Sequence, residues 1–292
     1  MSWLQIRVHA KADQAQALED ALLACGALSV TLQDDADQPI LEPELGTTPV
    51  WDETAIIGLF EANQDSEALK AALQANYYGE LPPFKLEILE DKDWIRAWME
   101  DYHPMRFGQR LWVCPSWREP PEPQAVNLML DPGLAFGTGT HPTTALCLEF
   151  LDQAVTGGEL VVDYGCGSGI LGIAALLLGA KDMLGIDIDP QALMATQDNA
   201  QRNGIDAARY QVYLPNKAPK AQADITVANI LAGPLAMLAP DIAAYTKKGG
   251  KLALSGLLAE QAQSVSDCYS QWFDMNPAKQ QGDWVVLTGI KR

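Results

Sequence analysis

Three alternating glycines follow a short apolar run near the middle of the chain. The run Leu160–Asp163 is typical of a buried strand, and the apolar segment Ile170–Leu178 that comes after the glycines is typical of a helix. Gly165, Gly167 and Gly169 lie between them. Glycines at such a strand-to-helix turn let the backbone bend sharply and let a ligand lie against it. The pattern therefore predicts a cofactor-binding turn.

The acidic residue before these glycines indicates which cofactor the turn would bind. A dinucleotide fingerprint has its third glycine at the sixth position, where this chain has Ile170. A pyrophosphate beside Asp163 would be repelled, whereas a cofactor with an amino group and a sulfonium cation would not. The motif thus favours S-adenosylmethionine over NAD, with Asp163, Gly165 and Gly167 as binding residues.

A second acidic residue ends the next predicted strand, residues 183–188. A carboxylate at this place can accept hydrogen bonds from both ribose hydroxyls of a cofactor. Asp187 fits that role, while Asp189 fits the N-cap of the helix that starts at Pro190.

Asn229 follows another predicted strand, residues 224–227. It would lie at the carboxyl edge of the sheet, where open α/β sheets bind ligands. Its side-chain oxygen and the neighbouring carbonyls can accept N–H groups of an amine and aim the nitrogen lone pair at a methyl carbon. The alternative is that Asn229 is only a turn residue, and the sequence leaves both open.

The loop of residues 131–144 is rich in glycine and threonine. Phe136 could cover an adenine ring or the methyl donor. We expect Phe136 and Thr140 to belong to the part of the loop that faces the substrate, and Thr144 offers a hydroxyl at the start of a helix. His141 could orient a substrate or accept a proton. It could equally be a hydrogen-bonded loop histidine without a chemical role.

The elements around these motifs divide the chain into two domains and a connection. Residues 104–292 alternate strands and helices, which predicts a parallel, doubly wound sheet. Together with the S-adenosylmethionine motifs above, this α/β domain resembles the Rossmann-like fold of class I methyltransferases. Residues 1–90 predict a ferredoxin-like β-α-β-β-α-β order, with strands at 3–9, 27–32, 55–61 and 84–89 and helices at 13–25 and 66–77. Asp13 is the expected N-cap of the first helix and Gly26 its stop.

Residues 91–103 predict a connecting helix with two tryptophans on one face. Trp94 and Trp98 are four residues apart, so their side chains lie on the same side of a helix. They would dock the connection on a domain, or alternatively contact the substrate.

The charge of the chain narrows the class of partner. The formal net charge is −18, with 38 acidic and 20 basic residues. Proteins that bind duplex nucleic acid present a basic face, since phosphate neutralisation dominates their affinity. Free nucleic acid is therefore disfavoured, and a basic protein or peptide is favoured because opposite fields steer encounter.

Cysteine usage and the apolar segments indicate the compartment. No two of the five cysteines have metal-ligand spacing, so we expect neither zinc nor any other metal, and no structural disulfide. The start of the chain lacks the pattern of a signal peptide, and Ile170–Leu178 is too short to span a bilayer. We expect a cytoplasmic monomer that does not bind membranes.

Together the motifs closely resemble those of one bacterial methyltransferase family. The segments 137–144, 163–169, 187–189 and 229–231 look like the corresponding motifs of the PrmA family, and the resemblance extends over essentially the whole chain. That family methylates protein eleven of the large ribosomal subunit with S-adenosylmethionine, on its N-terminal α-amine and on lysine side chains. The resemblance implies that Thr144, Gly165, Asp187 and Asn229 bind the cofactor, and that His141 lies where the substrate amine enters.

One departure from related amine methyltransferases bears on the substrate. Those enzymes carry Asn-Pro-Pro-Tyr where this chain has Asn229-Ile230-Leu231-Ala232. The missing aromatic residue argues against stacking on a planar substrate nitrogen and fits an aliphatic amine.

The expected reaction is an in-line attack of a neutral amine on a sulfonium methyl group, with alignment supplying much of the catalysis. A lysine with a pKa near 10.4 needs roughly 4.6 kcal/mol to be neutral at pH 7, and an α-amine near 7.8 needs roughly 1 kcal/mol. Either water or His141 could take the proton. The alternatives are an N-methyltransferase of another substrate class and a non-catalytic S-adenosylmethionine-binding module. In the favoured hypothesis, residues 1–90 recognise the ribosomal protein.

Overall fold

The computed structural model describes residues 2–38, 40–41, 46–90, 99, 102–131 and 141–292. The chain forms two compact units, Met1–Asp101 and Tyr102–Arg292, which are described separately. Most of the predicted connecting helix, including Trp94 and Trp98, lies outside the described residues, so this helix stays a prediction.

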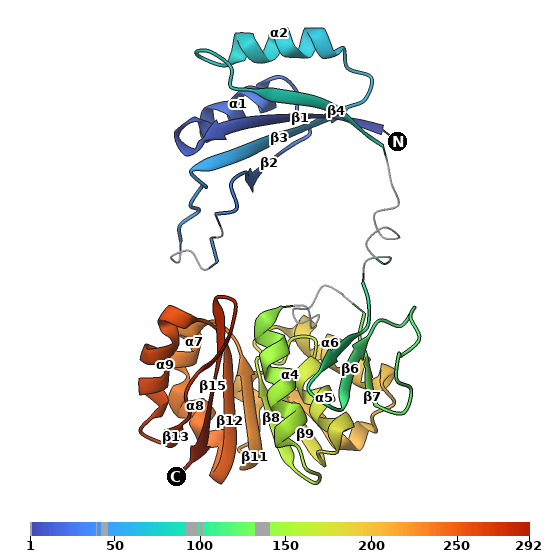
Figure 1. The fold of residues 1–292 in the computed structure, drawn as a ribbon, viewed down its shortest axis with the longest axis vertical. Coiled ribbons are helices and arrows are strands. Elements are labelled where there is room, and N and C mark those ends of the chain that lie inside the picture. The colour runs from blue at the N-terminus through green and yellow to red at the C-terminus, as the bar shows by residue number, and fades with distance from the viewer. Residues whose placement is uncertain (1, 39, 42–45, 91–98, 100–101, 132–140) are drawn as a thin grey trace. The chain divides into compact units, whose positions relative to one another are not determined.

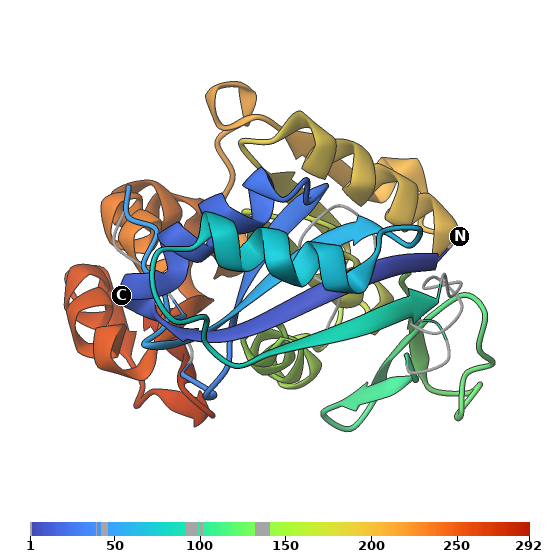
Figure 2. The ribbon, with the colours of Figure 1, turned by 90° about the horizontal axis from the view of Figure 1, so that it is seen from above.

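The first unit has the predicted β-α-β-β-α-β order, in which four antiparallel strands are covered on one face by two helices (Figures 1 and 2). Its sheet has the strand order β2-β3-β1-β4. The elements are β1 (Ser2–Lys11), α1 (Ala15–Ala24), β2 (Ser29–Asp34), β3 (Glu53–Glu61), α2 (Ser66–Asn76) and β4 (Phe84–Glu90).

Alternation along β1 explains why only one face is covered. Leu4, Ile6 and Val8 are buried against the helices, where they join Leu18 and Leu22 in one apolar cluster, and the residues between them are half-buried. A strand places successive side chains on opposite faces, so this pattern commits one face of the sheet to the core.

The predicted start of the first helix was wrong, whereas its stop was confirmed. Residues Ala12–Gln14 form a 3₁₀ turn, and α1 begins at Ala15 with Gln14 rather than Asp13 as its N-cap. The side chain of Gln14 accepts a hydrogen bond from the amide of Lys11, which closes the extra turn. Gly26 follows the helix with φ +88°, the left-handed conformation that favours glycine.

The second unit is built on an eight-stranded sheet of order β10-β9-β8-β11-β12-β15-β13, with β14 paired to β15 (Figure 1). The strands are β8 (Leu160–Tyr164), β9 (Asp182–Ile186), β10 (Tyr210–Tyr213), β11 (Ala223–Asn229), β12 (Thr246–Leu258), β13 (Phe273–Met275), β14 (Lys279–Gln281) and β15 (Trp284–Lys291). The helices are α4 (Pro142–Ala154), α5 (Ile170–Leu178), α6 (Pro190–Arg202), α7 (Ala232–Met237), α8 (Ala239–Tyr245) and α9 (Ala262–Tyr269).

The sheet has helices on both faces, as the doubly wound prediction requires. One apolar cluster joins α4 and α5 to one face, and another joins α7, α8 and α9 to the other. One end of the sheet departs from the predicted parallel arrangement. There, β15 is antiparallel to β12, and both β13 and β14 are antiparallel to β15. The chain reverses at Gly282 (φ +60°), so β14 and β15 form a hairpin that needs no crossover helix.

A small three-stranded sheet precedes α4. Its strands are β5 (Met105–Phe107), β6 (Leu111–Cys114) and β7 (Val126–Met129), in that order. Phe107, Leu111 and Leu128 pack into the same apolar cluster as α4 and α5. This sheet is therefore part of the second unit's core.

None of the described helices is long and apolar enough to cross a membrane. Among the described residues, no group of three or more histidine, cysteine or acidic side chains is placed to hold a metal ion. The five cysteines are free thiols.

Candidate functional site

The carboxyl ends of β8, β9 and β11 meet at one edge of the large sheet. These strands are parallel, and their registers place Tyr164 opposite both Ile186 and Ala228. Asp187 and Asn229, each of which comes directly after one of these positions, are thereby brought to the same edge as the glycine turn. The predicted cofactor residues share one location because the strands share one direction.

The glycine turn has no room for side chains at two of its positions. Gly165, Gly167 and Gly169 have φ values of +78°, +54° and +80°. A Cβ atom on Gly165 would lie 2.3 Å from Cγ2 of Ile230, and one on Gly169 would lie 2.8 Å from Cγ2 of Thr196. The turn thus needs glycine for its backbone conformation and for close packing against two other segments.

Asp187 supports the turn and keeps acceptor capacity. Its Oδ2 accepts a hydrogen bond from the amide of Gly167 at 2.9 Å, and its Oδ1 accepts one from the amide of Asp189 at 3.0 Å. Each carboxylate oxygen can accept a further hydrogen bond, which is what two ribose hydroxyls would need. Asp189 caps α6 as predicted, since its Oδ1 accepts a hydrogen bond from the amide of Gln191 at 2.8 Å.

Ile188 is a candidate residue that sequence reasoning missed. It lies between the two acids and exposes 83% of its surface, although it is a large apolar residue. An exposed aliphatic side chain beside the predicted ribose acid is suited to pack against the flat face of an adenine ring. Its position directly after Asp187 was the signal that could have found it.

Asp163 lies beneath the turn and has no exposed surface. Its Oδ2 accepts a hydrogen bond from the amide of Gly172 at 2.9 Å, and its Oδ1 has no hydrogen-bond partner among the described residues. Burial raises the pKa of this carboxyl from 3.8 to about 7. The residue holds the start of α5, and a direct contact with a cofactor stays a prediction.

Asn229 presents a buried acceptor without a partner at the sheet edge. Its Nδ2 donates a hydrogen bond to Oγ1 of Thr144 at 3.2 Å, which ties β11 to α4. Its Oδ1 is buried and has no hydrogen-bond partner among the described residues. Because buried polar atoms in folded proteins are nearly always paired, this oxygen fits an N–H donor of a ligand.

His141 is the N-cap of α4. Its Nδ1 accepts a hydrogen bond from the amide of Thr143 at 3.3 Å and lies 2.7 Å from the Thr143 hydroxyl. Burial lowers the pKa of this imidazole, so the ring is neutral near pH 7. With Nδ1 accepting, the neutral tautomer assigned from this network carries its proton on Nε2.

Trp284 is a second candidate that the sequence did not reveal. Its ring lies 4.7 Å from that of His141, centroid to centroid, at an interplanar angle of 70°. Trp284 is the first residue of β15, far along the chain from the other motifs. A single aromatic residue at the start of a strand carries no spacing signal, so only the fold brings it to His141.

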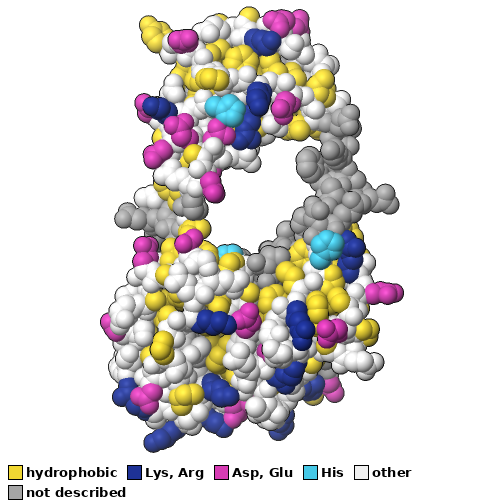
Figure 3. Space-filling model, viewed as in Figure 1, with side chains coloured by type: hydrophobic (Ala, Val, Ile, Leu, Met, Phe, Trp, Pro, Cys, Tyr) yellow, Lys and Arg dark blue, Asp and Glu magenta, His cyan; other side chains and the backbone are white. Residues whose placement is uncertain are grey.

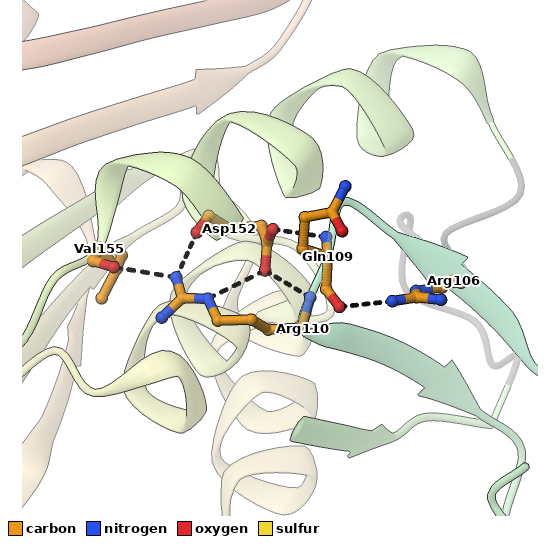
Figure 4. A network of polar contacts seen from close by, with 5 residues as sticks. All are labelled: Arg106, Gln109, Arg110, Asp152 and Val155. Carbon is orange, nitrogen blue, oxygen red and sulfur yellow. Dashed lines mark hydrogen bonds and ion pairs between the residues drawn. The ribbon is translucent and has the colours of Figure 1, made fainter. Parts of the chain in front are cut away.

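A polar clasp fixes α4, which carries His141 and Thr144, to the turn between β5 and β6 (Figure 4). Asp152, which is 4% exposed, accepts hydrogen bonds from the amides of Gln109 at 2.7 Å and Arg110 at 3.1 Å. The Arg110 guanidinium binds the Asp152 carboxylate and the carbonyl oxygens of Asp152 and Val155. The clasp sets where the helix lies relative to the sheet edge.

Two of the predicted site residues, Phe136 and Thr140, lie outside the described residues. Asp163, Gly165, Gly167 and Asp187 lie at or beneath the glycine turn, and Asn229, Thr144 and His141 lie where β11 meets α4. The site thus combines a glycine turn suited to a cofactor with the Oδ1 of Asn229, which no described residue pairs, and the aromatic pair of His141 and Trp284.

The chain matches the family model described as ribosomal protein L11 methyltransferase (PrmA) over residues 2–292. It is 59% identical over 292 residues to the ribosomal protein L11 methyltransferase of Ectopseudomonas mendocina, with 100% of both chains covered. The enzyme of the same name from Cellvibrio japonicus is 58% identical over 291 residues, covering 100% of this chain and 99% of the relative. A crystal structure of ribosomal protein L11 methylase from Lactobacillus delbrueckii subsp. bulgaricus superimposes with a TM-score of 0.58 and 32% identity, covering 65% of this chain and 100% of that one.

Proposed function

This chain belongs to the ribosomal protein L11 methyltransferase (PrmA) family, and we propose that it transfers methyl groups from S-adenosylmethionine to ribosomal protein L11. The acceptors are the N-terminal α-amine and lysine side chains of that protein. S-adenosylmethionine supplies the electrophilic methyl group, which it carries on a sulfonium sulfur.

The observation that carries the proposal is that the buried Oδ1 of Asn229 has no hydrogen-bond partner in the part of the chain that the structure describes. An amine nucleophile has N–H groups that this oxygen can accept, which leaves the nitrogen lone pair to be directed away from it. The bond from Asn229 Nδ2 to Thr144 fixes which way the amide faces, so the acceptor is preorganised rather than adaptable.

Removal of the amine proton falls to water rather than to His141. The Nδ1 atom already accepts from Thr143, and burial lowers the pKa of the ring, so a second proton is disfavoured. The paired rings of His141 and Trp284 then line the entrance through which the aliphatic amine reaches the site. The amine loses its proton to solvent before it docks.

The charge distribution supports a basic protein as the substrate. Residues 1–101 hold 20 of the 38 acidic residues and 6 of the 20 basic ones, a formal net charge of −14, while residues 102–292 have a formal net charge of −4. Figure 3 shows acidic side chains spread over the visible face of the first unit. We assign the grip on the ribosomal protein to this unit, because opposite charges steer encounter.

The same proposal places the enzyme in the bacterial cytoplasm and treats it as a monomer. The described cofactor-side and amine-side residues all belong to the second unit of one chain, so a single copy holds the candidate site.

A transfer assay tests the proposal directly. The purified chain is incubated with isotope-labelled S-adenosylmethionine and purified bacterial L11, and lysozyme serves as a basic protein of unrelated fold. We expect label in L11 only, and mass spectrometry should place it on the N-terminal amine and on lysines. Binding of S-adenosylmethionine without transfer to L11 would instead favour another substrate or a non-catalytic binding module.

A further inference from the structure

One face of α6 carries a row of polar side chains that the reaction outlined above does not use. Thr196, Asn199 and Asn203 are spaced by three and four residues, so they lie along one side of the helix. Thr196 and Asn199 are buried and Asn203 is half-buried. Buried polar groups of this kind are stable only where they are hydrogen-bonded, and each of these binds the backbone of another segment.

The first half of the row holds the glycine turn. Thr196 Oγ1 donates a hydrogen bond to the carbonyl oxygen of Gly167 at 3.0 Å, and Asn199 Nδ2 donates one to the carbonyl oxygen of Ser168 at 2.8 Å. The amide of Gly167 is already bound by Asp187. The peptide groups around Gly167 are therefore fixed from two sides, by Asp187 directly after β9 and by α6.

The second half of the row holds the end of β7. Asn203 Oδ1 accepts a hydrogen bond from the amide of Met129 at 2.7 Å, and its Nδ2 donates one to the carbonyl oxygen of Met129 at 2.8 Å. One side chain thus pairs both backbone groups of the last residue of β7, as a neighbouring strand would.

An ion pair anchors the chain a second time, two residues after Met129. Arg202 forms an ion pair with Asp131, with 3.1 Å between Nη1 and Oδ2. The carboxylate of Asp131 also accepts hydrogen bonds from the amide and hydroxyl of Ser116. The chain that leaves β7 toward His141 is thus anchored at Met129 and again at Asp131.

We propose that the polar face of α6 positions the two halves of the site relative to each other. Asn199 is a positioning residue for the cofactor turn. Asn203 is a positioning residue for the substrate side, because it holds the end of β7, and β7 packs in the same apolar cluster as α4, the helix that His141 caps. Asn199 lies in the last turn of α6 and Asn203 is its C-cap, so one helix end gives the cofactor turn and the amine entrance a common support. The substrate part of this inference rests on the proposed function.

Two alanine variants of the full chain separate the two roles. Asn203→Ala should lower kcat/KM for L11 about tenfold, the scale expected for one lost buried hydrogen-bonded pair. The Kd of this variant for S-adenosylmethionine should change less than about twofold. Asn199→Ala should raise the Kd for S-adenosylmethionine about tenfold. The Kd is measured by calorimetry, and kcat and KM are measured with L11 as the varied substrate.

Two further variants guard against a trivial loss of stability. Thr246→Val removes the buried hydrogen bond between the hydroxyls of Thr246 and Thr226, at 2.8 Å. Because Thr246 is the first residue of β12, away from the carboxyl ends of the strands, this variant should leave kcat/KM for L11 and the Kd for S-adenosylmethionine unchanged. Arg202→Met removes only the exposed ion pair, so it folds even if Asn203→Ala does not, and it should raise the KM for L11 about two- to threefold.

The inference is overturned if Asn203→Ala weakens cofactor binding as much as it impairs methylation, or if Thr246→Val gives the same kinetic defect. It is also overturned if Asn199→Ala leaves the Kd unchanged. These outcomes differ from failure of the proposed function, in which the unmodified chain binds S-adenosylmethionine but does not methylate L11. In that case the Kd of Asn199→Ala for S-adenosylmethionine still decides the cofactor part of the inference, and only the substrate part falls with the proposed function.

Discussion

At the scale of single residues, Asp187 combines a structural and a predicted binding role in one carboxylate. Replacing it with alanine removes the acceptor for the Gly167 amide and the expected partner of the ribose hydroxyls. We expect Asp187→Ala to weaken S-adenosylmethionine binding by about 1–3 kcal/mol, the scale of a lost charged hydrogen-bond pair. Calorimetric titration measures this change.

A matched control for this variant is Asp206→Ala. Asp206 likewise accepts a backbone amide hydrogen bond, from Ala208 at 2.9 Å, but it lies at a different turn of the chain. Its loss should leave the cofactor affinity unchanged. Unchanged affinity in Asp187→Ala would refute the assignment of the ribose acid.

Asn229 should influence turnover more than affinity. Its Oδ1, which no described residue pairs, is the acceptor proposed for the substrate amine. Misplacing a reacting group by about 1 Å can lower a rate about a hundredfold. We therefore expect Asn229→Ala to reduce kcat by about a hundredfold, with a much smaller rise in the Kd for S-adenosylmethionine. If rate and affinity fall by equal factors, Asn229 is a cofactor residue only.

Asp163 makes the stability of the second unit depend on pH. Its pKa is raised to about 7 by burial, against 3.8 for an unburied carboxyl, so the folded state holds this proton over a pH range where the unfolded state has lost it. The stability contributed by the neutral carboxyl is complete below about pH 3.8 and is lost as the pH rises through about 7.

Asp163→Asn keeps an acceptor for the Gly172 amide and removes the titration. The free energy of unfolding of the original chain should fall relative to that of the variant by about 1.4 kcal/mol per pH unit within this window, and the difference should level off above it. Urea unfolding at several pH values measures the difference. A constant difference across the window would show that Asp163 does not titrate there.

At the scale of elements, Gly108 lies in the turn between β5 and β6 and packs directly against Asp152 of the clasp that positions α4. It has φ +68°, and a Cβ atom there would lie 2.3 Å from Oδ2 of Asp152. Gly204 has the same φ, and no atom of the described residues lies within 4 Å of its Cβ position, so it is a matched control. Gly204→Ala should cost about 1 kcal/mol of stability from backbone strain alone.

Gly108→Ala should cost about 2–4 kcal/mol, because it also displaces a buried carboxylate from two backbone amides. Thermal or urea unfolding measures both variants. Equal destabilisation of the two would mean that the turn between β5 and β6 adapts without disturbing Asp152.

Sequence patterns predicted some elements to the residue and missed others for identifiable reasons. The bounds of α5 and the start of α6 were predicted correctly, since an apolar run after glycines and a proline after an N-cap aspartate are strong local signals. The strand β5 has three residues, too few to show alternation. The antiparallel end of the sheet was missed because strand direction depends on which segments pair, and no local pattern states it.

The candidate site shows the same division. Asp187, Thr144 and Asn229 were named from motifs, yet the bond between the last two joins residues far apart in the chain and depends on how α4 docks. Trp284 and the polar face of α6 act through tertiary contacts alone. Residues expected to bind a ligand directly can be recognised from sequence motifs. The residues that support them are recognised only once the tertiary packing is known.

At the scale of the whole molecule, the two units have separate cores and unequal charge. A truncated chain that begins at Asp91 keeps the whole second unit. We expect it to bind S-adenosylmethionine with near-normal affinity and to fail to methylate intact L11, because the acidic first unit is missing. Calorimetry and the transfer assay measure the two properties. Full activity of the truncated chain on L11 would return the first unit to a purely structural role.

The place of β15 in the large sheet has a consequence for biosynthesis. This strand comes after all the others in sequence, yet it lies between β12 and β13 and brings Trp284 to His141. A nascent chain emerges from the ribosome with its N-terminal part first. The sheet of the first unit is complete once β4 has emerged. In the second unit, one edge of β12 stays unpaired and β13 lacks its described partner strand until residues 284–291 are translated. A polypeptide stalled before that point would expose strand edges open to aggregation and would lack the aromatic partner of its helix cap.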